Sequence, residues 1–168
     1  ADRLVFSYWA TYNLPVVITR CVNNYGPYQY PEKVIPLFII NALQGKSLPV
    51  YGTGKNTREW IYVSDHCSAL DLILHSKDTD GEVFNLGSGI EYSSLNIAKF
   101  IIKKLNVSPQ LINFVKDRPG HVKRHSVNSN KFQKKFNFKF TNNFFNELED
   151  TINWYQNNQC WWDSIIKK

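Results

Sequence analysis

Short apolar runs alternate along the chain with longer segments in which apolar residues recur every three or four positions. The run at 14–19 (LPVVIT) is β-branched and bounded by turn residues, which is typical of a buried strand near 15–20, and its continuous apolar character favours a parallel sheet. The runs at 82–86 (EVFNL) and 111–115 (LINFV) predict two more strands. We therefore expect an α/β chain.

Helical periodicity covers much of the remaining sequence. Residues 1–12 and 33–44 predict two helices. Ser64 is expected to be the N-cap of a third helix, whose buried side includes Leu70 and Leu74. Further helices are expected at 94–105 (with Ser93 or Ser94 as N-cap), 129–136 and 144–157, and residues 160–168 are expected to be peripheral.

Two short β runs occupy residues 48–63, on either side of the turn Gly52-Thr53-Gly54. This pattern predicts either a hairpin or two strands joined by a loop. A Gly-x-Gly turn is weak evidence for phosphate binding here, because it lacks the strand, turn and helix of a dinucleotide site.

Composition and charge narrow the function classes. A chain of 168 residues with 43% hydrophobic and 20% charged residues can form one domain with a real core. The net charge of +6 permits nucleic-acid binding, but many lysines are scattered as on a solvated surface. The few arginines, among them Arg58, Arg118 and Arg124, lie in contexts typical of loops. They favour a compact anion such as a diphosphate over nucleic acid.

Several sequence features bear on the cellular setting. No apolar run approaches the roughly 20 residues of a membrane span, and the first residues do not resemble a signal peptide. Cys21, Cys67 and Cys160 are widely spaced, which indicates neither a disulfide framework nor a zinc or other metal site. We expect a cytoplasmic protein without a membrane partner. The absence of Met suggests that the chain is a fragment of a longer one.

Asn23 and Asn24 follow the first predicted strand. Ligands of open α/β sheets bind beyond the carboxyl ends of strands, and amide side chains can bind a pyrophosphate, a sugar hydroxyl or a carboxamide. An equally good interpretation of these residues alone is that the amides cap a turn.

Four segments together are more specific: NNYGP at 23–27, PEKVIP at 31–36, RxWxYV at 58–63 and DRPGH at 117–121. In these segments the chain resembles the nucleotide-sugar 4,6-dehydratases of the extended short-chain dehydrogenase superfamily, and most of all the members that act on dTDP-glucose. The resemblance covers nearly the whole chain but only the C-terminal half of the family's length.

The resemblance implies the C-terminal part of an NAD(P)-binding Rossmann-like fold plus a small α/β substrate-binding cap. The strands near 15–20 and 82–86 would contribute to the Rossmann sheet, and the segments near 48–63 and 111–127 to the cap. The N-terminal NAD-binding half would be absent from residues 1–168, and a homodimer is expected.

The resemblance also implies roles for individual residues. Lys33 and Val34 would contact the substrate, Arg58 would bind the diphosphate, and the loop after 115 would close over the diphosphate and ribose. The full expected set is Asn23, Lys33, Val34, Pro49, Val50, Tyr51, Arg58, Asp117, Arg118 and His121 for the substrate, and Asn24 for NAD. The family often has a substrate-contacting Asn near position 94, where this chain has Ser94.

Family members oxidise the sugar C4 with NAD, eliminate water across C5 and C6, and return the hydride to C6. The Gly-rich cofactor loop, a Tyr-x-x-x-Lys pair in its proper context and the acid/base carboxyl pair are not found in residues 1–168. We therefore expect binding without catalysis and assign no catalytic residue. The alternatives are a stand-alone nucleotide-sugar binding module or pseudoenzyme, part of a related NAD-dependent epimerase or decarboxylase, and a domain that binds no such ligand.

Overall fold

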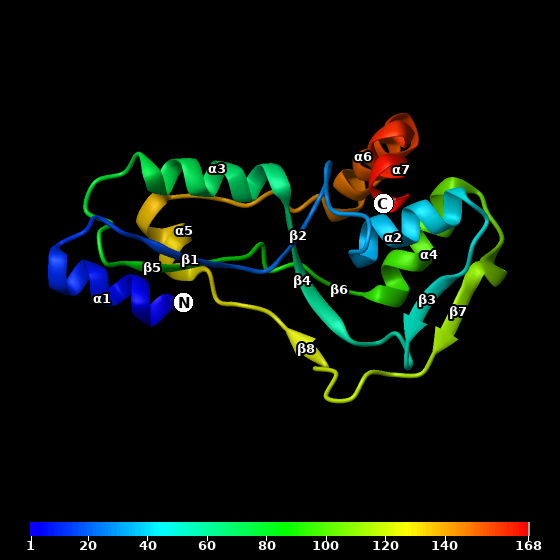
Figure 1. Cartoon of the computed structure of the whole chain (residues 1–168), viewed down its shortest axis with the longest axis horizontal. Coiled ribbons are helices and arrows are strands. Elements are labelled where there is room, and N and C mark those ends of the chain that lie inside the picture. Colours follow the sequence, from blue (N-terminus) through cyan, green and yellow to red (C-terminus); the bar gives the residue numbers. More distant parts are fainter. Residues whose placement is uncertain (168) are drawn as a thin grey trace.

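The computed structural model describes residues 1–167. Figure 1 shows an elongated molecule whose two lobes meet around strand β4. The elements run in this order: α1 (Asp2–Tyr12), β1 (Ile18–Cys21), β2 (Asn23–Tyr25), α2 (Val34–Leu43), β3 (Leu48–Tyr51), β4 (Thr57–Tyr62), α3 (Val63–Leu74), β5 (Val83–Leu86), β6 (Glu91–Ser93), α4 (Ser94–Leu105), the 3₁₀ turn η1 (Pro109–Leu111), β7 (Ile112–Val115), β8 (Arg124–His125), α5 (Asn130–Phe136), α6 (Phe144–Asn157) and α7 (Gln159–Ile166).

The first lobe is built on the parallel pair β1 and β5, in the register Ile18↔Val83 to Cys21↔Leu86. This confirms the expected parallel arrangement, although β1 begins at Ile18 rather than near residue 15. Helices α3 and α5 lie beside the pair in Figure 1. A small aromatic and aliphatic core forms between them: Val22, Ile61, Ala69, Ile73, Phe84, Leu86, Phe132 and Phe140.

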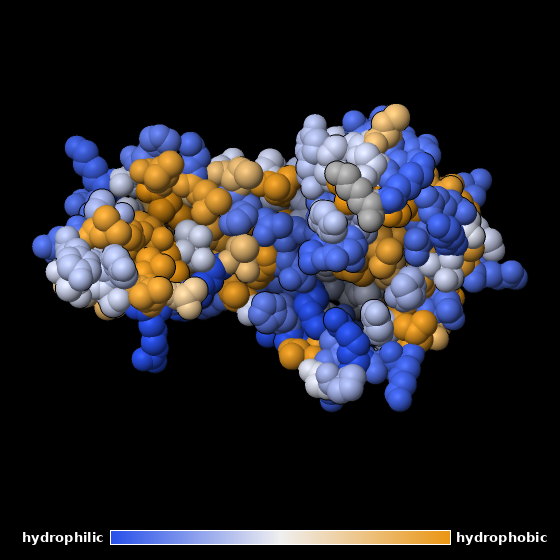
Figure 2. Space-filling view, viewed as in Figure 1, coloured by the Kyte–Doolittle hydropathy of each residue, from blue (hydrophilic) through white to orange (hydrophobic). Residues whose placement is uncertain are grey.

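Helix α1 buries none of its residues, although many of them are apolar. Leu4 and Tyr12 are 65% and 71% exposed. In Figure 2, apolar side chains also gather on the surface of this lobe. The expected helix is confirmed, and the structure leaves its apolar face uncovered.

The second lobe contains the larger core. Helix α2 contributes most of its residues to this core, because its sequence VIPLFIINAL is apolar on nearly every side. It ends where Gly45 takes a positive φ of 66°, as a C-terminal glycine does. The parallel pair β3 and β7 and the helices α4, α6 and α7 complete this lobe. None of the helices in the described range 1–167 has the length and apolar character that crossing a membrane would require.

Strand β4 connects the two lobes. It pairs in parallel with β2 and β8 and antiparallel with β6. The expectation that residues 48–63 could form a hairpin is wrong: β3 pairs with β7 instead, so the loop-linked alternative holds. Arg58 and Arg124 accordingly lie in strands rather than in loops.

Of the two N-cap residues predicted for α4 and α3, one is confirmed and the other is wrong. Ser93 caps α4 in a reciprocal capping box with Asn96, as one of the two alternatives predicted. Ser64 does not cap α3, because the helix begins at Val63 with Tyr62 in the N-cap position, two residues before Ser64, and no side chain caps it. The same helix buries Ala69 and Ile73 but exposes Leu70 and Leu74. The prediction that these two leucines are buried is therefore wrong.

The C-terminal segment is not peripheral, contrary to the expectation for residues 160–168, of which 160–167 are described. Trp162 on α7 is 2% exposed and belongs to the larger core. Its indole N–H donates a 2.8 Å hydrogen bond to the Tyr155 carbonyl at the end of α6. A buried indole with a satisfied N–H anchors the last helix against the rest of the lobe.

Replacing Trp162 with Ala should therefore lower the free energy of unfolding by about 3–5 kcal/mol, the usual cost of emptying a buried aromatic site. Urea denaturation at one fixed protein concentration would measure this loss. Ile166→Ala on the same helix is the matched control, since Ile166 is about half exposed. The control should change stability by about 0.5 kcal/mol or less. Equal effects of the two substitutions would contradict an anchoring role for Trp162.

Candidate functional site

A cavity of about 390 Å³ lies where the start of α2, the loop between β3 and β4, and the segment after β7 meet. Eight of the expected substrate residues line it: Asn23, Lys33, Val34, Pro49, Tyr51, Arg58, Arg118 and His121. The remaining lining residues are Glu32, Leu37, Phe38, Asn56, Trp60 and Ser94. Segments that are far apart in the sequence thus share one hollow.

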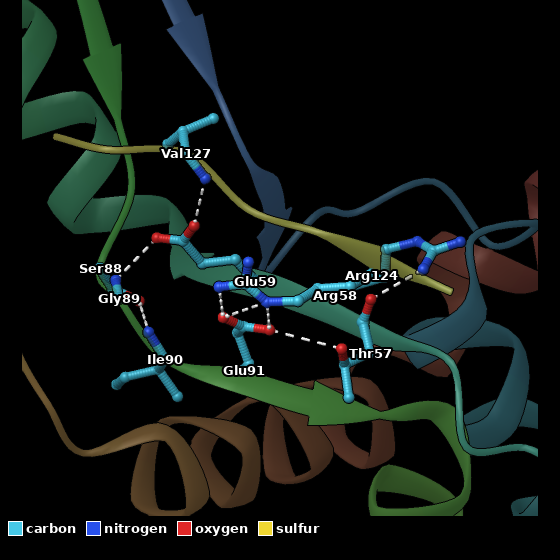
Figure 3. Close-up of polar contacts among 9 residues, drawn as sticks. All are labelled: Thr57, Arg58, Glu59, Ser88, Gly89, Ile90, Glu91, Arg124 and Val127. Carbon is cyan, nitrogen blue, oxygen red and sulfur yellow. Dashed lines mark hydrogen bonds and ion pairs between the residues drawn. The ribbon is translucent and has the colours of Figure 1, made fainter. Parts of the chain in front are cut away.

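The β4 backbone explains how part of this lining is assembled. Alternate residues of a strand point to the same face, so Arg58 and Trp60 project together towards the cavity. Asn23 is the ladder partner of Trp60 in the β2–β4 pair, which brings its amide to the same face. The Arg58 guanidinium donates a 2.7 Å hydrogen bond to the Thr57 carbonyl, which steadies it at the wall (Figure 3).

The N-terminus of α2 forms a second wall. Lys33 is the N-cap in an extended conformation, and Val34 begins the helix. The free backbone N–H groups and the dipole of a helix N-terminus favour an anion nearby. Lys33 adds a full positive charge, and its ammonium lies 2.9 Å from the Glu32 carboxylate in an exposed pair.

The DRPGH loop supplies the third wall. Gly120 has a φ of 68°, a conformation that favours glycine in this tight turn. Arg118 places its guanidinium carbon 5.0 Å from the centre of the Tyr51 ring. It also lies 3.3 Å from His121 Nε2, while His121 Nδ1 lies 2.6 Å from Asp117 Oδ1. One neutral tautomer satisfies both contacts, because Arg118 can only donate to Nε2, which leaves Nδ1–H to donate to Asp117.

Three expected residues do not line the cavity. Val50 is completely buried in the larger core, because its side chain points to the opposite face of β3 from those of Pro49 and Tyr51. Asp117 is exposed, and its Oδ1 accepts a hydrogen bond from His121 Nδ1. Asn24 follows Asn23 on β2 and lies outside the lining.

Asn24 has an unusual environment. Its side-chain N–H₂ donates to the Val22 carbonyl at 3.2 Å and approaches Cys21 Sγ at 3.4 Å. Its Oδ1 is buried and accepts no hydrogen bond from the described residues. A buried acceptor without a donor is costly, so this atom suits a ligand that offers an N–H group.

Several lining residues were not predicted from the sequence. Trp60 shares the β4 alternation with Arg58, and that alternation was visible in the sequence, whereas Asn56 lies in the loop just before β4. Leu37 and Phe38 could not be recognised, because on an apolar helix they are indistinguishable from core residues. Ser94 lines the cavity, although the resemblance left this position uncertain.

Comparison with known proteins connects this geometry with a family. Residues 1–151 match the model of the GDP-mannose 4,6 dehydratase family. The chain is 43% identical to dTDP-glucose 4,6-dehydratase from Streptomyces niveus, over 98% of this chain and 48% of that protein. The chain spans about half the length of the curated relatives it matches.

Two solved structures show the same fold. The dTDP-glucose 4,6-dehydratase from Bacillus anthracis, in complex with NAD, has a TM-score of 0.89 and 45% identity over 97% of this chain and 51% of that one. The UDP-glucuronic acid 4-epimerase from Bacillus cereus, in complex with UDP-glucuronic acid and NAD, has a TM-score of 0.87 and 27% identity over 93% and 50%.

The fold and the cavity thus define an α/β protein of the Rossmann-like dehydratase and epimerase class. The chain belongs to the GDP-mannose 4,6 dehydratase family. This confirms the expected family resemblance and the correspondence to the C-terminal half of its relatives. The expected cofactor is confirmed for the family, since the two solved relatives contain NAD.

The DRPGH loop has a testable electrostatic consequence. The hydrogen bond from His121 is the main cause that lowers the pKa of Asp117, and the Arg118 amide adds to it. A lowered folded pKa means that the stabilisation is present above the ordinary pKa of Asp and is lost as the pH falls through the lowered value. In His121→Ala, the Asp117 pKa should move back up towards its ordinary value.

An NMR titration of the side-chain carboxyl carbon would measure this pKa. Glu82, whose pKa is lowered by its hydrogen bond from Lys131 in the first lobe, is the internal control, and this lowered pKa should be the same in both proteins. An Asp117 titration that does not change in His121→Ala would show that the hydrogen bond is not formed in solution.

Proposed function

We propose that this chain forms the substrate-binding part of an NAD-dependent nucleotide-sugar 4,6-dehydratase whose substrate is a dTDP-hexose. The observation that carries the proposal is the convergence of Lys33, Arg58 and Arg118 on one cavity beside Asn23. Lys33 already pairs with Glu32. Arg58 and Arg118, however, have no carboxylate partner among the described residues, and like charges that share a cavity repel one another unless an anion lies between them. A diphosphate is an anion of the right charge for this position.

The rest of the lining suits the other parts of such a ligand. Guanidinium groups can bind phosphate oxygens in a bidentate manner, which a single ammonium cannot. The exposed ring of Tyr51, with Arg118 over it and Pro49 nearby, offers a flat surface for a nucleobase. The Asn23 amide can donate to and accept from a sugar hydroxyl.

Asn24 is the residue of this chain that we assign to NAD. When bound, NAD supplies a hydride acceptor for oxidation of the sugar. The unpaired, buried Oδ1 of Asn24 would accept a hydrogen bond from the carboxamide N–H₂ of the nicotinamide ring. We assign no catalytic residue, and we propose that catalysis needs the NAD-binding half that corresponds to the remaining length of the relatives.

A nucleotide-sugar epimerase is the second candidate within the same fold. The B. cereus epimerase shares the architecture but has 27% identity, against 45% for the B. anthracis dehydratase. The combined NNYGP, PEKVIP and DRPGH segments also favour the dehydratase. We therefore retain dehydration as the proposed reaction of the whole enzyme.

The uncovered face of α1 and the neighbouring β1–β5 pair are the proposed contact with further polypeptide. A parallel sheet is normally covered on both faces, and an isolated two-stranded sheet is marginal in water. We propose that the NAD-binding half covers the sheet, and that the chain on its own self-associates through this surface.

Isothermal titration calorimetry with dTDP would test the binding proposal. We expect Arg58→Ala to weaken binding by roughly 1.5–3 kcal/mol, the contribution of a hydrogen bond to a charged group. Arg3→Ala is the matched control, because it removes a guanidinium from α1, outside the cavity. The control should leave the dissociation constant unchanged. Binding of dTDP that does not depend on Arg58 would exclude the proposed diphosphate site.

Sedimentation velocity of the chain at micromolar concentrations would test the contact proposal. We expect species larger than one chain, and we expect the double substitution Leu4→Ser and Tyr12→Ser to reduce them, since both side chains are largely exposed. The double substitution Leu70→Ser and Leu74→Ser, on the exposed side of α3, controls for general surface apolarity. A single species with the mass of one chain, together with cooperative unfolding, would contradict the proposal.

A further inference from the structure

Glu59 is a charged residue in the interior, outside the cavity lining. Its side chain is 1% exposed, and it lies on β4 between Arg58 and Trp60, which both face the cavity. Figure 3 shows its carboxylate pointing away from the Arg58 guanidinium, as strand alternation requires. Burying a carboxylate is expensive unless hydrogen bonds compensate for the lost water.

Two backbone amides compensate for this loss. The Gly89 N–H donates to Oε1 at 2.7 Å, and the Val127 N–H donates to Oε2 at 2.8 Å. These amides belong to segments 38 positions apart in the sequence (127 − 89 = 38), which the carboxylate joins to one another and to β4 (Figure 3). Each oxygen of the Glu59 carboxylate thus accepts a hydrogen bond from a different segment of the chain.

The hydrogen bond from Val127 to Glu59 is the last of several contacts that join residues 123–127 to β4. The Thr57 N–H donates to the Lys123 carbonyl at 2.9 Å, and β8 then pairs with Thr57 and Arg58. Arg124 binds Glu91 of β6 through two of its nitrogens, at 2.5–3.1 Å (Figure 3). The stretch 123–127 is therefore fastened to β4 at both ends.

This stretch is the C-terminal anchor of the loop that carries Arg118 and His121. The N-terminal anchor of the loop is β7, which pairs with β3. Between residues 115 and 123, the only regular hydrogen bond within the described backbone is the turn from the His121 N–H to the Arg118 carbonyl. The position of the loop over the cavity consequently depends on its two anchors and on the packing of Arg118 against the Tyr51 ring.

We propose that Glu59 is a positioning residue that sets the distance between Arg58 and Arg118 across the diphosphate cavity. It does so by holding Val127 and Gly89 against the strand from which Arg58 projects. This inference rests on the proposed function, because it assigns Glu59 a role in that same nucleotide site.

Gly87 supports this role. A Cβ at this position would overlap Glu59 Oε1 and also contact Val127, so the residue leaves room for the carboxylate. Ser129 fixes the same turn by donating a 2.7 Å hydrogen bond to the Gly87 carbonyl. Gly87→Ala would displace the carboxylate while keeping its charge.

The test combines a double-mutant cycle with a measurement that needs no ligand. Glu59→Gln keeps the size of the side chain but offers one acceptor oxygen, and its N–H₂ then faces an amide donor. We expect Glu59→Gln to weaken dTDP binding about tenfold in the wild-type background, and about twofold or less once Arg118→Ala is present. Equal weakening in both backgrounds would overturn positioning through Arg118.

Hydrogen exchange of the ligand-free chain, followed by NMR, is the second measurement. In Glu59→Gln, the amides of Gly89 and Val127 and those of residues 118–121 should exchange faster, while the amides of α6 should not change. Unchanged exchange at 118–121 would overturn the proposal. If exchange rises as expected but no protein in the series binds dTDP, the role of Glu59 in holding the loop is supported, and the proposed function is contradicted.

Ile152→Val controls for a general loss of stability, because it trims a buried methyl group in the core of the second lobe and Ile152 does not line the cavity. Its dissociation constant for dTDP should equal that of the wild type. If Glu59→Gln does not fold, Gly87→Ala replaces it in both measurements, with the same expected pattern. A Gly87→Ala protein with wild-type binding and wild-type exchange would overturn the proposal.

Discussion

The structure depends on strand β4, because three other strands form backbone hydrogen bonds with it. β2, β6 and β8 all pair with it, so the strand holds together segments from widely separated parts of the chain. Its side chains alternate between two faces of the strand. Arg58 and Trp60 face the cavity, and Glu59 faces the interior. A shift of this strand by one residue would exchange those faces and destroy both the cavity and the buried carboxylate site.

The cavity concentrates positive charge without neutralising it completely. Lys33 is balanced by Glu32 in a solvent-exposed pair, and Arg118 contacts the ring of His121. Arg58 has a backbone carbonyl as its partner rather than a carboxylate. Arg58 and Arg118 thus have no carboxylate partner among the described residues, which supports the anionic ligand proposed above.

Local patterns in the sequence predicted most helices and strands, because helix periodicity, capping residues and apolar runs act over a few positions. The start of α4 at Ser93 and the end of α2 at Gly45 are examples. Strand pairing was not predictable in the same way. Residues 48–63 were compatible with a hairpin, and only the presence of β7 beside β3 shows why they do not form one. The buried position of Trp162 likewise depends on α6, which precedes it.

By itself, the sequence determined the α/β class and the family, because the NNYGP, PEKVIP, RxWxYV and DRPGH segments carry that information in short stretches. These segments also contain six of the eight predicted residues that line the cavity, and the other two, Pro49 and Tyr51, come from the stretch 48–51. Only the tertiary structure decided that Val50 lies in the core and that Glu59 joins Gly89 to Val127. The physical reason is that burial and hydrogen bonding of these residues are set by partners far away in the chain. No local pattern specifies such partners until the strands have paired.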